Sequence, residues 1–161
     1  MHVLKNSFSL ELSNHVEILI SKYKQDRVDK PELGGVLLGL SENNRFKIVR
    51  ASEPNSFDKS TRHTIDRNRE IDQILIRYEE ANSSGKVIYL GEWHTHPQDI
   101  PKISNQDQQM MRMRLKLSKL QLPRVFLAIQ GIYQLGIWTF EGTKTTELTY
   151  SPLNHEWVEN Y

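Results

Sequence analysis

The chain has 161 residues and a formal net charge of +1, which indicates one domain and gives no polybasic signal for nucleic acid. It has no cysteine, which excludes a disulfide framework, a Cys-ligated zinc site and the zinc nucleobase deaminases, whose motif requires two cysteines. No apolar run reaches transmembrane length and the N-terminus lacks an apolar signal core, so we expect a cytoplasmic protein without a membrane partner.

The first half of the chain alternates helical and strand patterns. Apolar residues at helical spacing predict a helix over residues 13–23, capped by Ser13 or Asn14. Residues 34–40 and 46–51 predict a hairpin joined across residues 41–45. The helical period returns over residues 67–81 and stops at a Ser-Ser-Gly sequence.

The second half begins with a buried strand, Val87 to Leu90, followed by a helix from Ser104 to about Leu120. Three successive strands are then predicted over residues 124–130, 132–140 and 144–150. We interpret Ser151 to Tyr161 as a polar tail outside a domain of residues 1–150. The order predicts an α/β or α+β fold, with a mixed, mostly antiparallel sheet covered by helices on both sides.

The Gly-Glu-Trp-His-Thr-His-Pro segment, residues 91–97, predicts part of a metal site. On a continuing strand, His94 and His96 point to the same face, roughly 6–7 Å apart at Cα. Asp107 lies in the first turn of the next helix, which the loop 98–103 can fold back over the strand end. Two imidazoles and a carboxylate suit Zn²⁺ with one position left open.

Each part of this pattern has a simpler interpretation. Ser104-x-x-Asp107 is close to a capping box, in which the serine is the N-cap of the helix. His94 and His96 alone could be a half-exposed pair at a strand end. The two features in tandem favour a metal site, and Ser104 can cap the helix and still serve that site.

Together, His94-x-His96-Pro97 and Ser104-x-x-Asp107 resemble the JAMM motif of the JAB1/MPN/Mov34 family of zinc metalloproteases. The family pattern also has a glutamate before an apolar strand, a position that Glu32 matches. The resemblance covers nearly the whole chain. It implies a single JAMM/MPN domain, similar in plan to the cytidine deaminase-like fold.

The resemblance also implies a role for each motif residue. His94, His96 and Asp107 would hold one Zn²⁺ per chain. Glu32 would act as general base and then as general acid in the hydrolysis of an amide or isopeptide bond. Ser104 would donate a hydrogen bond to the oxyanion. Glu92, beside the histidines, is the alternative base, or else it supports the ligands or faces the substrate.

The substrate is less constrained by the sequence. Residues 53–66 could form a wall of a peptide groove, in which an extended tail adds to a sheet edge, or could be an ordinary connection. His63 within them is interpreted as an exposed or satisfied histidine. The basic residues of the 104–120 helix and its surroundings predict a solvated face rather than a groove for acidic substrates: Arg112, Arg114, Lys116, Lys119 and Arg124.

Two segments, Gly-Glu-Trp-His-Thr-His-Pro at residues 91–97 and Asp-x-x-x-x-His-Thr-Ile-Asp-Arg-Asn at residues 58–68, are similar to the deconjugating protease of bacterial anti-phage operons among family members. That resemblance implies a nucleotidyltransferase substrate, conjugated through its C-terminal residue by ubiquitin-like E1 and E2 enzymes. The alternatives are a peptidase for a ubiquitin-like sulfur-carrier precursor, a small-amide hydrolase and a non-catalytic MPN scaffold. A metal-dependent nuclease is disfavoured because it usually needs more carboxylates and a basic channel.

Overall fold

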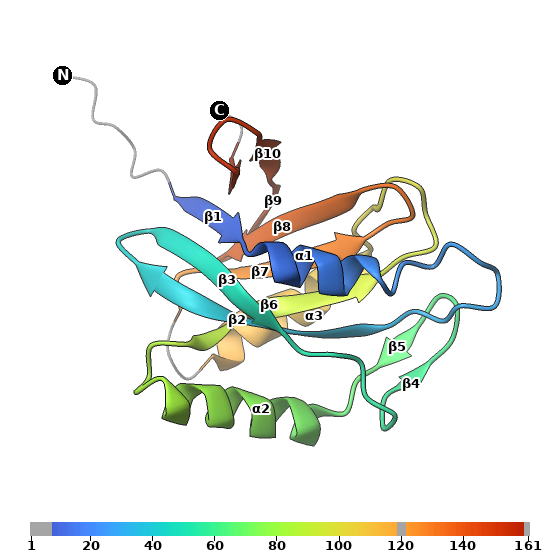
Figure 1. Ribbon diagram of the computed structural model, residues 1–161, viewed down its shortest axis with the longest axis horizontal. Coiled ribbons are helices and arrows are strands. Elements are labelled where there is room, and N and C mark those ends of the chain that lie inside the picture. Colours follow the sequence, from blue (N-terminus) through green and yellow to red (C-terminus); the bar gives the residue numbers. More distant parts are fainter. Residues whose placement is uncertain (1–7, 119–121, 160–161) are drawn as a thin grey trace.

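A nine-stranded sheet runs through this computed structural model, which describes residues 8–118 and 122–159 (Figure 1). The strand order in the sheet is β10-β11-β1-β3-β2-β6-β7-β8-β9. Its strands are β1 (Ser9–Leu12), β2 (Gly34–Glu42), β3 (Arg45–Ala51), β6 (Ile88–Thr95), β7 (Val125–Gln130), β8 (Leu135–Glu141), β9 (Lys144–Glu147), β10 (Thr149–Ser151) and β11 (Glu156–Val158). A separate two-stranded sheet is made of β4 (Lys59–Ser60) and β5 (Ile65–Asp66). The helices are α1 (Asn14–Ser21), α2 (Arg69–Asn82) and α3 (Asn105–Leu117).

The sheet is mixed and mostly antiparallel, as predicted. Within the described ranges, only β1–β3 and β6–β7 pair in parallel. The strand that carries the histidine motif, β6, lies between β2 and β7. Hydrogen bonds from both neighbours therefore fix its position, and burial removes it from solvent along most of its length.

Helices cover both faces of the sheet, as predicted. Side chains alternate along a strand, so Phe126 of β7 packs on the face covered by α1, together with Val16. Its neighbour Leu127 packs on the other face with Met111 of α3. Figure 1 shows α1 in front of the sheet, α3 behind it and α2 along the lower edge. No helix in the described part of the chain is long and apolar enough to cross a bilayer.

Several element boundaries differ from the predicted ones because one turn is tighter and another longer than the pattern suggests. The first hairpin turns at Asn43 and Asn44 alone, both with positive φ, so β2 and β3 extend into the predicted loop 41–45. The strand predicted from residue 132 begins at Leu135, because Gly131 donates its N–H to the carbonyl of Gln134. The predicted end of the third helix at Leu120 lies outside the described residues.

The prediction of a solvated basic face on the third helix is wrong for its arginines. Arg114 donates from Nε to Glu92 Oε2 at 3.0 Å, and Arg112 donates to the Thr145 hydroxyl. Arg124 is buried and places its guanidinium 3.6 Å from the centre of the Phe8 ring. Lys116 is exposed, and Lys119 lies outside the described residues.

The segment interpreted as a tail adds a strand to the sheet. The predicted strand 144–150 divides into β9 and β10, and β11 follows and pairs with both β10 and β1. Trp157 of β11 lies opposite Leu10 and is only 8% exposed. Its ring packs against that of Tyr150, with centroids 5.4 Å apart. Residues 156–158 therefore contribute to the hydrophobic core.

We expect Trp157→Ala to lower the free energy of unfolding by about 3–5 kcal/mol, because it removes a large buried side chain. Denaturant unfolding followed by circular dichroism would measure the loss. Leu153→Ala is the matched control, since Leu153 precedes the same strand and is 93% exposed. If both variants unfold within about 0.5 kcal/mol of the wild type, this segment is not part of the core.

Candidate functional site

The close pairing of β2 with β6 brings Glu32 to the histidine motif. Gly34 lies opposite His94, and a Cβ at Gly34 would be only 2.5 Å from the carbonyl oxygen of Trp93. Thr95 donates its N–H to the carbonyl of Leu33 at 2.9 Å. Glycine at position 34 allows the two strands to approach closely here. Glu32 and Leu33, which directly precede this glycine, therefore lie beside the two histidines.

The end of β6 presents two imidazoles on one face, as the strand spacing predicts. The Nε2 atoms of His94 and His96 are 3.2 Å apart, and their ring centroids are 4.9 Å apart. Pairing continues past the strand, because His96 donates its N–H to the carbonyl of Gln130 at 3.0 Å. Both rings are therefore held by backbone that is bonded on each side.

The first turn of α3 supplies Asp107 through a capping box. Ser104 Oγ accepts from the Asp107 N–H, and Asp107 Oδ2 accepts from the Ser104 N–H, both at 3.0 Å. The same carboxylate lies 3.2 Å from His94 Nε2 through Oδ1 and 3.4 Å from His96 Nε2 through Oδ2. The capping box is therefore compatible with the predicted ligand role, because the cap orients the Asp107 carboxylate toward the histidines.

The three donor groups have the spacing that a small tetrahedral cation requires. Ligand bonds of about 2.0–2.1 Å at tetrahedral angles place donor atoms about 3.3 Å apart. The two Nε2 atoms are 3.2 Å apart, and the Asp107 carboxylate approaches each ring through a different oxygen, with Oδ1 3.2 Å from His94 and Oδ2 3.4 Å from His96. Glu32 Oε1 is farther, at 3.8 and 3.7 Å from the two Nε2 atoms. Glu32, His94 and His96 form an alternative group that could hold a metal ion, because one donor atom from each lies within 4.8 Å of the other two. We regard Asp107 as the better third ligand because it is nearer to both rings.

The surroundings of the two carboxyl groups of the site, Glu32 and Asp107, shift their pKa values in opposite directions. Burial raises the pKa of Glu32 to about 7, against the lowering effect of His94. Burial also acts on Asp107, but the hydrogen bond and charge of His94 and the Ser104 N–H outweigh it and lower the pKa to about 2. Asp107 is therefore a stable anion suited to a cation, whereas Glu32 is suited to exchange a proton near neutral pH.

The pKa values of the two imidazoles, His94 and His96, are also shifted in opposite directions. Burial lowers the pKa of His94, but its hydrogen bond to Asp107 and the charges of Asp107, Glu32 and Glu92 together raise it. Burial and the neighbouring His94 lower the pKa of His96. His96 thus keeps an available lone pair, which is the form that binds a metal.

A cleft of about 470 Å³ opens onto these groups. Its lining includes Glu32, the two histidines, Ser104 and Asp107, so all five residues singled out from the sequence come together. The cleft is also lined by His63 and Thr64 at the turn of the β4–β5 hairpin and by Ile65 at the start of β5. Residues 53–66 were predicted to be either a groove wall or an ordinary connection. Residues 63–65 within them line the cleft, which favours the first prediction for this part of the segment.

The Glu92 side chain forms hydrogen bonds away from the donor cluster. Its carboxylate accepts from Arg69 and Arg114 and from the Tyr89 hydroxyl, each at 3.0 Å. The side chain is 2% exposed and lies outside the lining of the cleft. This geometry favours Glu32 over Glu92 as a base.

Sequence reasoning missed one buried support of the site. Gln25 is fully buried, and its Oε1 accepts from the hydroxyl of Thr95, the residue between the two histidines, at 2.9 Å. Its amide nitrogen donates to the carbonyls of Lys30 and Arg62. A lone glutamine between a helix and a strand carries no signal of such a role.

The family described as prokaryotic homologs of the JAB domain matches residues 15–140. The chain belongs to this family. The match spans α1 to most of β8 and includes every residue of the donor cluster. It confirms the resemblance noted in the sequence.

Three curated relatives of this prokaryotic JAB chain are each named CD-NTase/cGAS isopeptidase. The Escherichia coli protein is 33% identical over 97 residues, which cover 56% of this chain and 62% of the relative. The Vibrio cholerae protein is 34% identical over 104 residues, covering 65% and 67%. The Pseudomonas aeruginosa protein is 36% identical over 76 residues, covering 47% and 48%. The chain thus spans about half to two thirds of the length of these relatives.

A solved structure confirms the fold. The solution structure of a protein from Desulfitobacterium hafniense is similar to this prokaryotic JAB domain with a TM-score of 0.58. The match covers 86% of this chain and 88% of that protein. At 18% identity it supports the architecture alone.

We expect His94→Ala and Asp107→Ala to lose a bound divalent metal, because each removes one of three donors from the cluster. Elemental analysis of purified protein would measure about one metal per wild-type chain. His63→Ala is the matched control, since His63 lines the same cleft outside the donor cluster. Full metal retention in both ligand variants would contradict the assignment.

Proposed function

We propose that this chain is a zinc-dependent isopeptidase that releases a nucleotidyltransferase from an amine to which its C-terminal residue has been joined. The observation that carries this proposal is the close cluster of the His94 and His96 nitrogens with the Asp107 carboxylate, and with Glu32 beside it. The names of the curated relatives support the substrate class. The E1- and E2-like enzymes that would make such a conjugate are the corresponding partners.

His94, His96 and Asp107 would hold the metal. The choice of zinc rests on the donor set, because two neutral imidazoles and one carboxylate suit Zn²⁺ better than the oxygen-seeking Mg²⁺ or Ca²⁺. When bound, zinc would supply Lewis-acid polarisation of the scissile carbonyl and an acidified water.

Glu32 is the proton-transfer group in this proposal. Its carboxylate lies at the edge of the cluster, and its raised pKa allows it to take up a proton and to release it near neutral pH. It would accept the proton of the attacking water and deliver it to the leaving amine. The amine must leave protonated, because an amide anion is a very poor leaving group.

Ser104 keeps a free donor for the oxyanion. A hydroxyl has one hydrogen to donate and two lone pairs, and the cap uses one lone pair to accept from Asp107. The side chain lines the cleft. Its O–H would therefore donate to the oxygen that becomes negative in the tetrahedral intermediate.

In this proposal an extended C-terminal tail, and not a folded surface, occupies the cleft. The walls are the β4–β5 hairpin on one side and the start of α3 on the other. An extended chain can add to a free strand edge through main-chain hydrogen bonds. A small amide or a ubiquitin-like sulfur-carrier precursor would use the same chemistry and is the second candidate. The complete donor set disfavours a non-catalytic scaffold.

The decisive experiment compares wild type with Glu32→Gln on three substrates. They are a nucleotidyltransferase joined through its C-terminal residue to a lysine amine, a linear ubiquitin-like precursor and a small chromogenic amide. We expect the wild type to cleave the conjugate, and Glu32→Gln to keep its metal but lose about 10²–10⁴-fold in turnover. Cleavage of only the linear precursor or the small amide would favour the second candidate. No cleavage by metal-loaded wild type would favour the scaffold.

We expect Ser104→Ala to lower turnover by about 10²–10³-fold if the hydroxyl serves the oxyanion, and to destabilise the protein by about 1 kcal/mol through loss of the cap. Ser104→Gly separates the two effects, because glycine at an N-cap costs only a few tenths of a kcal/mol. Turnover and denaturant unfolding would be measured for both. If Ser104→Gly restores the rate along with the stability, the serine acts only as a cap.

A further inference from the structure

The hairpin that forms one wall of the cleft is too short to be stable by itself. It pairs only Lys59 with Asp66 and Ser60 with Ile65. A two-stranded sheet of this size is marginal in water, even when its strands are longer. Residues 63–65 of the hairpin nevertheless line the same cleft as the donor cluster. Other contacts must hold the hairpin there.

An ion pair closes the base of this hairpin. Asp58 directly precedes β4 and Arg67 directly follows β5, so the two residues extend the ladder by one position. Arg67 Nε lies 3.8 Å from Asp58 Oδ2, and the side chains are only 5% and 2% exposed. Asp58 Oδ1 also accepts from the N–H of Asn68 at 2.7 Å.

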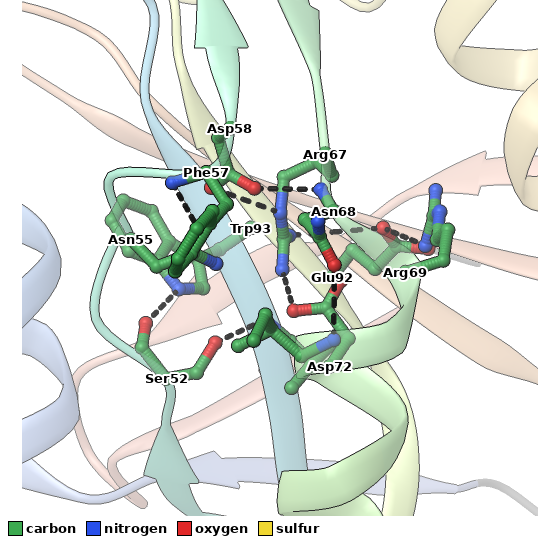
Figure 2. A network of polar contacts seen from close by, with 12 residues as sticks. Ser52, Asn55, Phe57, Asp58, Arg67, Asn68, Arg69, Asp72, Glu92 and Trp93 are labelled. Atoms are coloured by element: carbon green, nitrogen blue, oxygen red, sulfur yellow. Dashed lines mark hydrogen bonds and ion pairs between the residues drawn. The ribbon is translucent and has the colours of Figure 1, made fainter.

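Arg67 also joins this base to the rest of the domain. Its guanidinium forms an ion pair with Asp72 in the first turn of α2. It also lies 3.8 Å from Glu92 Oε1 in β6. Figure 2 shows Arg67 between these three carboxylates, which come from three different parts of the fold. Glu92 is two residues from His94, so the hairpin base is fixed to the strand that carries the histidines.

The turn of the hairpin is tied as well. Glu32 donates its N–H to the carbonyl of Thr61 at 2.7 Å. Gln25 donates its side-chain amide to the carbonyl of Arg62 at 2.8 Å. The wall is thus attached at its tip to the segment that carries Glu32, and at its base to β6.

We propose that Arg67 is a positioning residue that holds the β4–β5 hairpin as a preformed wall of the substrate cleft. Arginine suits this position because its delocalised charge attracts all three carboxylates while its planar group donates a hydrogen bond to Asp72. Arg67 Nε and Asp58 Oδ2 form no hydrogen bond among the described residues, so their contact at the hairpin base is purely an ion pair. A wall that is ordered before the substrate arrives spares the cost of ordering it on binding. This inference rests on the proposed function only for what binds in the cleft.

The test uses Arg67→Met with Arg114→Met as the matched control. Arg114 donates to the same Glu92 carboxylate but lies in α3, and among the described residues it forms no hydrogen bond or ion pair with the hairpin. For the conjugate, we expect Arg67→Met to raise KM by about tenfold or more and to change kcat by less than about threefold. The small amide, which does not reach the hairpin, should keep its kcat/KM. Arg67→Lys should recover part of the loss.

A second readout does not depend on activity. Lys59 and Arg62 lie in the hairpin and are trypsin sites, so the rate of cleavage after them reports its opening. We expect faster cleavage there in Arg67→Met than in wild type or Arg114→Met, with an unchanged metal content. If Arg67→Met does not fold, Asp58→Asn is used instead, because it removes only the charge that faces Arg67.

Unchanged trypsin protection in Arg67→Met would overturn the proposal, and so would an opened hairpin with an unchanged KM. An equal rise of KM in Arg114→Met would also overturn it, because the effect would then pass through Glu92 alone. If wild type cleaves no conjugate, the proposed function is wrong, and the trypsin comparison still decides whether Arg67 holds the hairpin.

Discussion

The 3.2 Å approach of two imidazole nitrogens, one on the buried His94 and one on the half-buried His96, is the constraint on which the site depends. Two uncharged acceptors at this distance repel unless a proton or a cation lies between them. The fold accepts this arrangement because β2 and β7 hold β6 from both sides. It then surrounds the pair with two carboxyl groups, Asp107 and Glu32, whose protonation preferences differ.

The donor cluster was predictable because each member follows a local rule. His94 and His96 alternate on a strand, and Asp107 is placed by its own capping box. The features that the sequence did not predict depend on contacts between distant segments, or on a departure from the regular alternation of side chains along a strand. Leu37 pairs with Gly91 but Leu38 with Tyr89, so Leu90 is bulged. Gly91 permits this bulge, since a Cβ there would meet the carbonyl of Phe126 at 1.8 Å. The bulge reverses the alternation and brings the Tyr89 hydroxyl to Glu92, which simple period-two reasoning places on opposite faces.

The charged residues around Glu92 are a second case of long-range contacts that the sequence does not predict. Three arginines, from β5's end, α2 and α3, face three carboxylates, from the segment before β4, α2 and β6. In the sequence, these residues look like ordinary surface charge on helices and loops. Buried ion pairs add little net stability, because desolvation offsets their attraction, but an unpaired member would be very costly. The network therefore specifies which segments must meet more than it strengthens the fold.

Through this network, the hairpin that lines the cleft and the donor cluster are both attached to one strand, β6. Glu92 and His94 lie two residues apart on β6, a separation of roughly 7 Å that the backbone fixes. The first anchors the hairpin wall through Arg67, and the second belongs to the donor cluster. The wall that would align a substrate tail and the atoms that would attack its carbonyl thus share one rigid element. An amide hydrolase gains most from such rigidity, because small displacements of the scissile bond relative to the attacking group are costly to the rate.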